Sequence, residues 1–554
     1  MRGVATMRIA VASSLLLLAL PVGCVGGPDP EPADPASLPD TAELEQPFTS
    51  DVATLMDFEF DGELTSNSGV NLKNQVRSQL MFTVGHLNGE RSVARLDKLV
   101  LTNTTVASIG SGLYRVRYHA KLPVAWGSKT NLPTAYSFTL PKRVDWSGQS
   151  TFTTKYGATC NDGDDASVTI NNYWYHYRPR ATGCSMAPAD VSTMNAVVTV
   201  NATNTVAKYP EYHKLWEDGA LNTVAIFGKY AAGATSQSDA GIAAYNEFID
   251  ALLTKYPDAL STPSVLPDYA IGPSVTDVTF KFDRSGGRVT VTVLLVDAVT
   301  AVTATWDKRY AELTAGADLI LYNGHAGLGA NIASLSRKGK FFPGAYQIFF
   351  MNGCDTFAYY DNTLPSIRAA LNPSDPTGTR FMDFITNAMP AYFHALTEDS
   401  MALINAAVAH TTPTTYQNIF KNMDRVQVVV VTGEEDNVFS STYDDGVTWN
   451  GLEAEGAVGK SQTVSYVTET LPAGKYVFTT TPDPAAPGGD ADLRVRVGAA
   501  PTITSTYKCP SYQYNSNEKC SITLTAPAKV YLAVTGDKLG VNSRYYLRGF
   551  QLPR

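Results

Sequence analysis

Two apolar stretches near the middle of the chain, DLILYNGHAGLG at 318–329 and YQIFFMNGCD at 346–355, decide how the rest of the sequence is interpreted. Each is a short apolar run that ends in Asn-Gly, followed by a chemically versatile residue: His325 in the first and Cys354 in the second. Apolar runs of this length are typical of strands buried on both faces of a parallel sheet. Because neighbouring parallel strands end at the same edge, the sequence predicts that His325 and Cys354 lie close together.

Strand-like and helix-like segments alternate around these two runs. An apolar strand at 223–230 is followed by residues 239–253, whose apolar side chains recur at spacings of three and four, as in an amphipathic helix. A hairpin is expected at 278–297 and a further strand at 381–386. This alternation predicts a central α/β domain over 208–440, with a mainly parallel sheet covered on both faces.

The segments on either side of this domain have a different pattern. Residues 48–207 contain alternating runs such as LYRVRYHAKLPVAW (113–126) and SVTINNYWYHY (167–177), which predict an all-β sandwich with the aromatic residues of the second run on one strand. After a linker at 441–460, residues 461–554 return to short strands and predict a small β-sandwich. The expected fold is therefore multidomain, with two β-sandwiches flanking the α/β domain.

The composition agrees with several folded units and excludes some functions. At roughly 100 to 200 residues per domain, a chain of 554 residues corresponds to about three domains. With 44% hydrophobic and 17% charged residues, the chain can bury several cores and is not a disordered polymer. The net charge of −9 leaves no excess of basic side chains to neutralise phosphates, so no nucleic-acid partner is expected.

The N-terminus has the pattern of an export signal. Residues 1–23 combine two arginines with an apolar stretch too short to span a bilayer comfortably, and they predict a signal peptide. Cys24 resembles the cysteine of a bacterial lipobox, which implies a lipid on Cys24 and an exported protein held on a membrane surface of the cell envelope. The alternative is an ordinary cleaved signal and a secreted protein. Residues 24–47 predict a flexible tether.

The six cysteines divide into two local pairs and two single residues. In the oxidising surroundings of an exported protein, cysteines close in sequence are expected to form disulfides. Two disulfides are predicted: Cys160 with Cys184, and Cys509 with Cys520. With Cys24 assigned to lipid, Cys354 remains as a free thiol, which is either buried and inert or used in chemistry.

The predicted edge of the sheet has the groups that thiol chemistry needs. A thiol becomes a good nucleophile beside an imidazole or backbone amide dipoles. Glycines let backbone N–H groups approach a substrate carbonyl, as an oxyanion hole requires, and they lie at Gly324, Gly327, Gly329 and Gly353. Asp297, at a strand end, is a candidate for orienting the imidazole; the alternative is a solvated acid. The remaining histidines show no metal-ligand spacing, so no metal or cofactor is predicted.

These motifs resemble a known group of peptidases. An apolar block ending in histidine, followed by a second ending in cysteine, is similar to the caspase-like superfamily of cysteine peptidases, and the spacing of 29 positions is nearest to the gingipain family. The resemblance covers about 210–440 and implies a caspase-like α/β domain, with Cys354 as nucleophile and His325 as general acid/base. It also implies oxyanion donors on the backbone of Cys354 and of Ala326 or Gly327, since Ala326 stands where the family has glycine.

The C-terminal segment resembles a second family. The stretches LPAGKYVF and GGDADLRVRVG, the two cysteines and the YLAVTG segment are similar to the bacterial pre-peptidase C-terminal domain. Such domains are commonly attached to exported peptidases, so this resemblance favours proteolysis.

Taken with the Cys–His pattern, this predicts an exported, monomeric cysteine endopeptidase. It would hydrolyse peptide bonds of a polypeptide substrate through a Cys–His dyad and a thioester acyl-enzyme. The alternative is a catalytically inactive caspase-like surface lipoprotein that binds protein or polysaccharide. At this stage it stays open whether the N-terminal β-rich unit is an inhibitory propiece.

Overall fold

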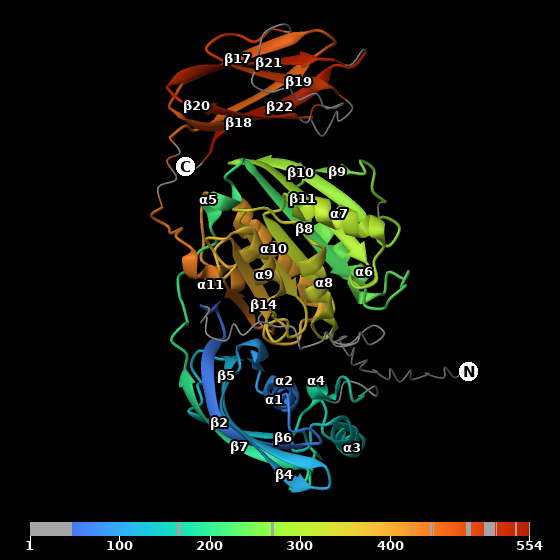
Figure 1. Cartoon of the computed structure of the whole chain (residues 1–554). Helices are drawn as coiled ribbons and strands as arrows, with labels where there is room; N and C mark the ends of the chain where they lie inside the picture. The colour runs from blue at the N-terminus through green and yellow to red at the C-terminus, as the bar shows by residue number, and fades with distance from the viewer. Residues whose placement is uncertain are drawn as a thin grey trace, which may run out of the picture.

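The computed structural model describes residues 47–162, 168–267, 271–424, 426–443, 446, 448–482, 489–502, 516, 518–537 and 540–552. Figure 1 shows three bodies in a row: an N-terminal unit in blue and teal, a central unit from green to light orange, and a C-terminal unit in orange and red. The predicted signal peptide, Cys24 and all but the last residue of the predicted tether lie outside the described residues. None of the helices described is long and apolar enough to cross a membrane.

The central unit is built on one nine-stranded sheet. Its strands, in spatial order, are β1 (Thr49–Ser50), β15 (Val429–Thr432), β14 (Met382–Asn387), β13 (Gln347–Asn352), β12 (Leu319–Asn323), β8 (Ala220–Gly228), β11 (Gly287–Val296), β10 (Asp277–Arg284) and β9 (Leu260–Thr262). The strands from β14 to β11 in this order run parallel to one another, whereas the pairs at both edges are antiparallel.

The prediction of a mainly parallel, caspase-like α/β sheet is therefore wrong. The sheet is mixed, and the molecule as a whole is rich in β-structure. One cause is the tight hairpin that reverses the chain between β10 and β11, where Arg284 pairs with Gly287. The other is β1, which comes from the start of the N-terminal unit and adds an antiparallel edge to β15.

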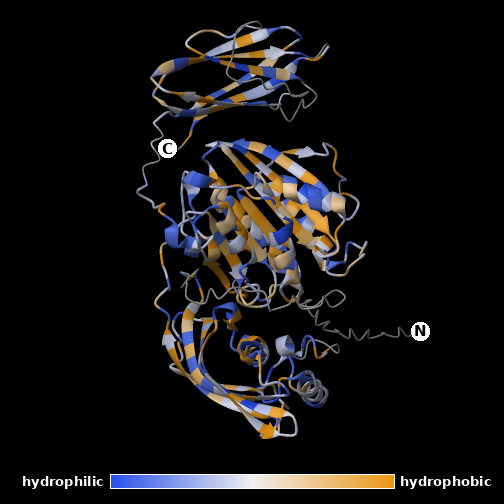
Figure 2. Ribbon diagram, viewed as in Figure 1, coloured by the Kyte–Doolittle hydropathy of each residue, from blue (hydrophilic) through white to orange (hydrophobic). Residues whose placement is uncertain are grey.

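Helices cover both faces of the central sheet. The helices α6 (Ala240–Lys255) and α10 (Leu396–Val408) pack on one face, and α7 (Ala304–Thr314), α8 (Ala330–Lys338) and α9 (Thr363–Leu371) pack on the other. Two short helices are α5 (Tyr212–Leu215) and α11 (Tyr416–Phe420). Asp239 is the N-cap of α6, and its carboxylate accepts hydrogen bonds from the backbone of Gly241 and Ile242. Figure 2 shows the strands between these layers as largely apolar, as expected for strands buried on both faces.

The N-terminal unit is a single antiparallel sheet with helices on one side. Its strand order is β3 (Val93–Ala94), β5 (Leu113–Trp126), β2 (Thr54–Ser66), β7 (Val191–Val200) and β6 (Ala135–Pro141), and β4 (Val100–Gly110) also pairs with β5. Its helices are α1 (Leu72–Leu80), α2 (Phe82–Asn88), α3 (Trp146–Tyr156) and α4 (Tyr173–His176). The predicted β-sandwich is wrong, because these helices cover the apolar face where a second sheet was expected. The aromatic run expected on a strand forms α4 instead, with its rings buried.

The C-terminal unit consists of two antiparallel sheets that pack around one apolar cluster. The first sheet contains β16 (Leu452–Val458), β22 (Ser543–Gln551), β18 (Gly474–Pro482) and β20 (Glu518–Leu524). The second contains β17 (Thr463–Leu471), β21 (Ala528–Gly536) and β19 (Ala491–Val497). Buried side chains from both sheets meet between them, among them Phe478 and Leu532.

The two flanking units contact opposite ends of the central parallel strands (Figure 1). The C-terminal unit contacts the ends at which β8 and β11 begin: Arg288 donates a hydrogen bond of 2.9 Å to the carbonyl of Thr480. The N-terminal unit contacts the ends at which β13 and β14 finish: Asn88 donates a hydrogen bond of 3.1 Å to Asp355. His325 and Cys354 lie at this second end.

Candidate active site

The turns that follow β12 and β13 touch each other. The strands pair in parallel with Asn323 opposite Asn352, and the N–H of Gly324 donates to the carbonyl of Asn352 at 3.1 Å. A Cβ atom on Gly353 would lie 2.8 Å from the carbonyl oxygen of Gly324 and 3.3 Å from the nitrogen of Ala326. Glycine at this position therefore permits the contact, and the segments that carry the two predicted residues meet at one edge of the sheet.

His325 is held in one orientation by its surroundings. Its side chain is buried, with Nε2 2.9 Å from the carbonyl oxygen of Tyr230, so Nε2 carries a hydrogen and donates it to that carbonyl. The rings of Tyr230 and Phe393 pack against the imidazole, each with its centroid 5.2 Å from that of His325. A backbone carbonyl thus orients the imidazole.

Asp297, the acid considered for that role, points elsewhere. Its carboxylate forms an ion pair of 2.7 Å with Lys229 and accepts a hydrogen bond of 3.1 Å from the backbone of Gly233. It makes no hydrogen bond to His325. Its side chain is 55% exposed, which agrees with the alternative interpretation of a solvated acid at a strand end.

Cys354 is almost completely buried and is not a free thiol. Its exposed fraction is 1%, and its Sγ lies 3.5 Å from the carbonyl oxygen of Ala391. The sulfur is disulfide-bonded, and its partner lies outside the described residues. The prediction of a free thiol at Cys354 is therefore wrong. It set Cys24 aside for lipid and assigned disulfides to cysteines that are close in sequence, whereas in a folded chain disulfides form between cysteines that are close in space.

The other cysteines are disulfide-bonded or lie outside the described residues. The predicted disulfide between Cys160 and Cys184 is present, with a Cα–Cα distance of 4.8 Å. Cys520 is also disulfide-bonded, with a partner outside the described residues, and Cys509 itself lies outside them. Lipid attachment at Cys24 stays a prediction for the same reason.

The loop after His325 has an unusual backbone. Ala326 has ordinary helical angles, with φ −70° and ψ −22°, and is followed by a 3-10 turn, η3 (Gly327–Gly329), which leads into α8. All three residues of this turn have positive φ, including Leu328 at +50°, where a side chain is rarely tolerated. The backbone nitrogen of Ala326, directly before this turn, lies next to Gly353, as an oxyanion donor would require.

A network of buried amides lies directly beneath this edge. The strands β12, β13 and β14 each end in asparagine, at Asn323, Asn352 and Asn387. The Asn352 side chain donates to Asn323 at 3.2 Å, and Asn387 donates to Asn352 at 2.7 Å. Because Asn323 and Asn352 precede the turns of His325 and Cys354, the network ties these two turns together.

Asp399, in the first turn of α10, completes this network. It accepts hydrogen bonds from the side chains of Asn352 (3.3 Å) and Gln427 and from the backbone of Asp424 (2.9 Å). Its burial raises the pKa of the carboxyl to about 7. Sequence patterns did not point to Asp399, since no local pattern links it to the strands. The repeated Asn-Gly at two strand ends could have indicated the amides.

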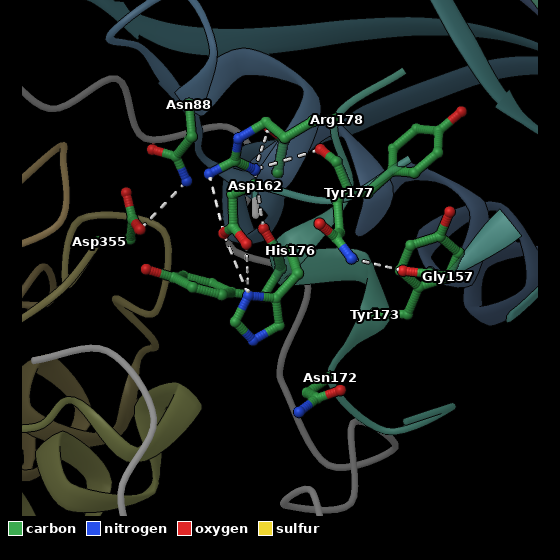
Figure 3. Close-up of polar contacts among 12 residues, drawn as sticks. Asn88, Gly157, Asp162, Asn172, Tyr173, His176, Tyr177, Arg178 and Asp355 are labelled. Atoms are coloured by element: carbon green, nitrogen blue, oxygen red, sulfur yellow. Dashed lines mark hydrogen bonds and ion pairs between the residues drawn. The ribbon is translucent and has the colours of Figure 1, made fainter. Parts of the chain in front are cut away.

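The N-terminal unit covers the segment that follows Cys354. Figure 3 shows the hydrogen bond from Asn88 to Asp355, beside the hydrogen-bonded group of His176, Asp162 and Arg178. Asp355 is completely buried there, and this burial raises the pKa of its carboxyl to about 7.

Apolar and aromatic contacts extend the same interface. The guanidinium of Arg95 lies 4.4 Å from the ring centroid of Tyr360 and 4.9 Å from that of Phe357. Trp174 packs edge-on against Tyr359, with ring centroids 6.1 Å apart. Cys354 belongs to the same apolar cluster as the core of the N-terminal unit. The candidate site is therefore closed in this structure.

Among the described residues, no group of histidine, cysteine, aspartate or glutamate side chains could hold a metal ion.

No family model matches the chain. Over 92 residues, which are 17% of this chain, the sequence is 29% identical to the alkaline serine exoprotease A of Vibrio alginolyticus. One segment of the chain is thus similar to part of a peptidase. The match spans only 16% of that relative's length, and the relative is a serine enzyme, not a cysteine peptidase.

A structural comparison gives a weaker similarity. A 4-O-methyl-alpha-glucuronidase with specificity for decorated arabinogalactans is 11% identical, with a TM-score of 0.12, over 44% of this chain and 32% of the glucuronidase. A TM-score this low does not indicate a shared fold. Neither protein is described as a caspase-like peptidase, so that resemblance rests on the short motifs around His325 and Cys354 alone.

Proposed function

We propose that the chain is a cysteine peptidase whose nucleophile is Cys354 and whose general acid/base is His325. One observation carries this proposal: the parallel register of β12 and β13 puts both residues on touching turns at the carboxyl ends of strands. The backbone carbonyl that orients His325 supports it, and so does the similarity of one segment to part of an exoprotease. The motifs around the two residues resemble those of caspase-like peptidases.

The reaction follows from the chemistry of these groups. The Cys354 thiolate attacks the carbonyl carbon of a peptide bond, and the carbonyl oxygen becomes an oxyanion that accepts hydrogen bonds from backbone N–H groups of Cys354 and Ala326. The C–N bond then breaks while protonated His325 gives its proton to the leaving amine. Water, deprotonated by His325, hydrolyses the thioester and regenerates the thiol.

In this proposal the described state is latent. A sulfur held in a disulfide cannot act as the thiolate nucleophile, and the N-terminal unit packs over the segment after Cys354. A thiol reductant would break the disulfide by exchange, releasing Cys354 as a thiolate while the reductant is oxidised to its own disulfide. Catalysis therefore requires reduction at Cys354 and access for a polypeptide. Export, and lipid attachment at Cys24, are part of the same proposal.

A non-catalytic binding protein is the second candidate, and one observation favours it. Cys354 is 1% exposed and disulfide-bonded, as a structural cysteine would be. In that case the central unit is a scaffold, and the flanking units contact the partner protein or polysaccharide.

Peptide cleavage after reduction separates these two functions. The full chain is treated with a mild thiol reductant and incubated with a peptide mixture, and new termini are identified by mass spectrometry. The peptidase proposal predicts cleavage that disappears in Cys354→Ala and His325→Ala. His119→Ala, on β5 of the N-terminal sheet, is the control for loss of a histidine and retains cleavage. Equal products from wild type and Cys354→Ala would exclude the peptidase.

A further inference from the structure

The backbone carbonyl of His325 is held by two buried side chains. The hydroxyl of Tyr322 donates a hydrogen bond of 2.7 Å to it, and the side-chain amide of Asn331 donates a second, also of 2.7 Å. Asn331 also donates to the Tyr322 oxygen at 3.1 Å, so the three groups form a closed triangle. Burial raises the pKa of Tyr322 well above its ordinary value, which keeps the hydroxyl protonated as a donor.

These two side chains come from the elements on either side of the His325 loop. Tyr322 lies on β12, and Asn331 lies in the first turn of α8. Glycines make room for the phenol: a Cβ atom on Gly228 or Gly324 would come within 3.2 Å of the Tyr322 oxygen. The amide of Asn331 in turn packs against Gly327, where an added Cβ atom would lie 3.2 Å from it. The surrounding backbone therefore leaves room for both donors.

A peptide unit is planar, so its carbonyl and its N–H cannot turn independently. The carbonyl of His325 and the N–H of Ala326 belong to the same peptide unit. A contact that fixes the direction of this carbonyl therefore fixes the direction of the Ala326 N–H. The Ala326 nitrogen lies beside Gly353, since a Cβ atom on Gly353 would be 3.3 Å from it.

We propose that Tyr322 and Asn331 are positioning residues that hold the His325–Ala326 peptide unit so that its N–H is an oxyanion donor for a carbonyl bound at Cys354. This inference rests on the proposed function. It also accounts for Ala326 at a position where the resembled family has glycine. The donor is a backbone N–H, and the helical φ and ψ of Ala326 are accessible to alanine.

Two reactions of the same sulfur test this role. Acylation by p-nitrophenyl acetate passes through an oxyanion, with p-nitrophenolate as leaving group, whereas alkylation by iodoacetamide displaces iodide without forming one. Both rates are measured at Cys354 in the reduced full chain, by mass spectrometry of the Cys354 peptide after acid quenching. Tyr322→Phe is expected to slow acylation about ten-fold and to leave alkylation within about two-fold of wild type. Asn331→Ala is expected to show the same selective loss.

Tyr310→Phe is the matched control. Tyr310 is buried in the same apolar cluster as Tyr322, but its hydroxyl has no hydrogen-bond partner among the described residues. Its removal should change neither rate. Unchanged acylation in Tyr322→Phe and Asn331→Ala would overturn the positioning role, and so would an equal decrease in both reactions, which indicates a structural effect. Absence of acylation in the wild-type chain, with alkylation intact, would instead overturn the proposed peptidase itself.

Discussion

The N-terminal and C-terminal units are both rich in β-structure, yet they contact the central sheet in different ways. The C-terminal unit meets the amino ends of β8 and β11 through a buried ion pair, Arg288 with Asp283, and through Thr479 and Thr480. The N-terminal unit contributes strand β1 to the sheet and shares an apolar cluster with Cys354. Among the described residues, it is the N-terminal unit that contacts the end of the sheet where His325 and Cys354 lie. Position along the parallel strands therefore decides which unit can control the candidate site.

Removing one buried cation at each interface should show which of the two flanking units controls access to Cys354. Arg95 is buried with its ion-pair partner Asp97 in the N-terminal unit and packs on Tyr360, whereas Arg288 is buried with Asp283 near the C-terminal unit. Arg95→Ala leaves the buried carboxylate of Asp97 without its ion-pair partner, and Arg288→Ala leaves Asp283 with the more distant Arg548, at 4.0 Å. Each variant should lower the free energy of unfolding by about 3 to 5 kcal/mol in urea titrations.

The reactivity of Cys354 then distinguishes the two variants. In the reduced chain, Arg95→Ala should speed alkylation of Cys354 by iodoacetamide, because the covering unit is held less firmly. Arg288→Ala should leave that rate unchanged despite a similar loss of stability. Equal acceleration in both would mean that general destabilisation, and not the N-terminal contact, controls access.

The buried carboxyl of Asp355 predicts a pH effect at the N-terminal interface. Its pKa is raised from an ordinary value of 3.8 to about 7, chiefly by burial. Between these two values the folded chain keeps the proton on Asp355, whereas in the unfolded chain the exposed carboxyl has lost it. The free energy of unfolding should therefore fall as pH rises from about 4 to 7, by roughly 4 kcal/mol, and then level off.

Asp355→Asn tests this assignment. Asparagine can still accept the hydrogen bond from Asn88 and has no proton to lose in this range. Urea titrations at several pH values between 4 and 8 should give a shallower slope for the variant than for wild type. Parallel curves for the two proteins would show that Asp355 does not titrate in this way.

The smallest expected effects come from single hydroxyl groups at the two interfaces. Ser50 on β1 donates a buried hydrogen bond of 2.7 Å to the carbonyl of Val429, and Thr479 donates one of 3.2 Å to Asp283. Ser50→Ala and Thr479→Val should each lower the free energy of unfolding by about 1 kcal/mol. Only Ser50→Ala should also speed Cys354 alkylation, since β1 links the N-terminal unit to the central sheet. A loss of stability in Thr479→Val with none in Ser50→Ala would contradict this view of β1.

Local patterns predicted the parts of the fold that depend on local physics. The buried strands around Tyr322 and Phe350 were evident from their apolar runs, and α6 was evident from the three- and four-residue spacing of its apolar side chains. The meeting of the His325 and Cys354 turns followed from the rule that neighbouring parallel strands end at one edge.

Features that depend on distant partners were not predictable in the same way. The alternation in 113–126 fits a sheet covered by helices as well as it fits a sandwich, because both bury one face. β1 contains two residues, too few for a periodic pattern, and its place is set by β15. The disulfide at Cys354 and the contacts of Asp399 likewise join segments far apart in the sequence.

The most direct test of the central claim is the pH dependence of Cys354 alkylation in the reduced chain. If His325 lies beside the sulfur and stabilises its thiolate, wild-type Cys354 should react with iodoacetamide at pH 6 about ten times faster than in His325→Ala, with the two rates converging above about pH 9. Superimposable pH profiles for the two proteins would show that the imidazole and the sulfur do not form a pair.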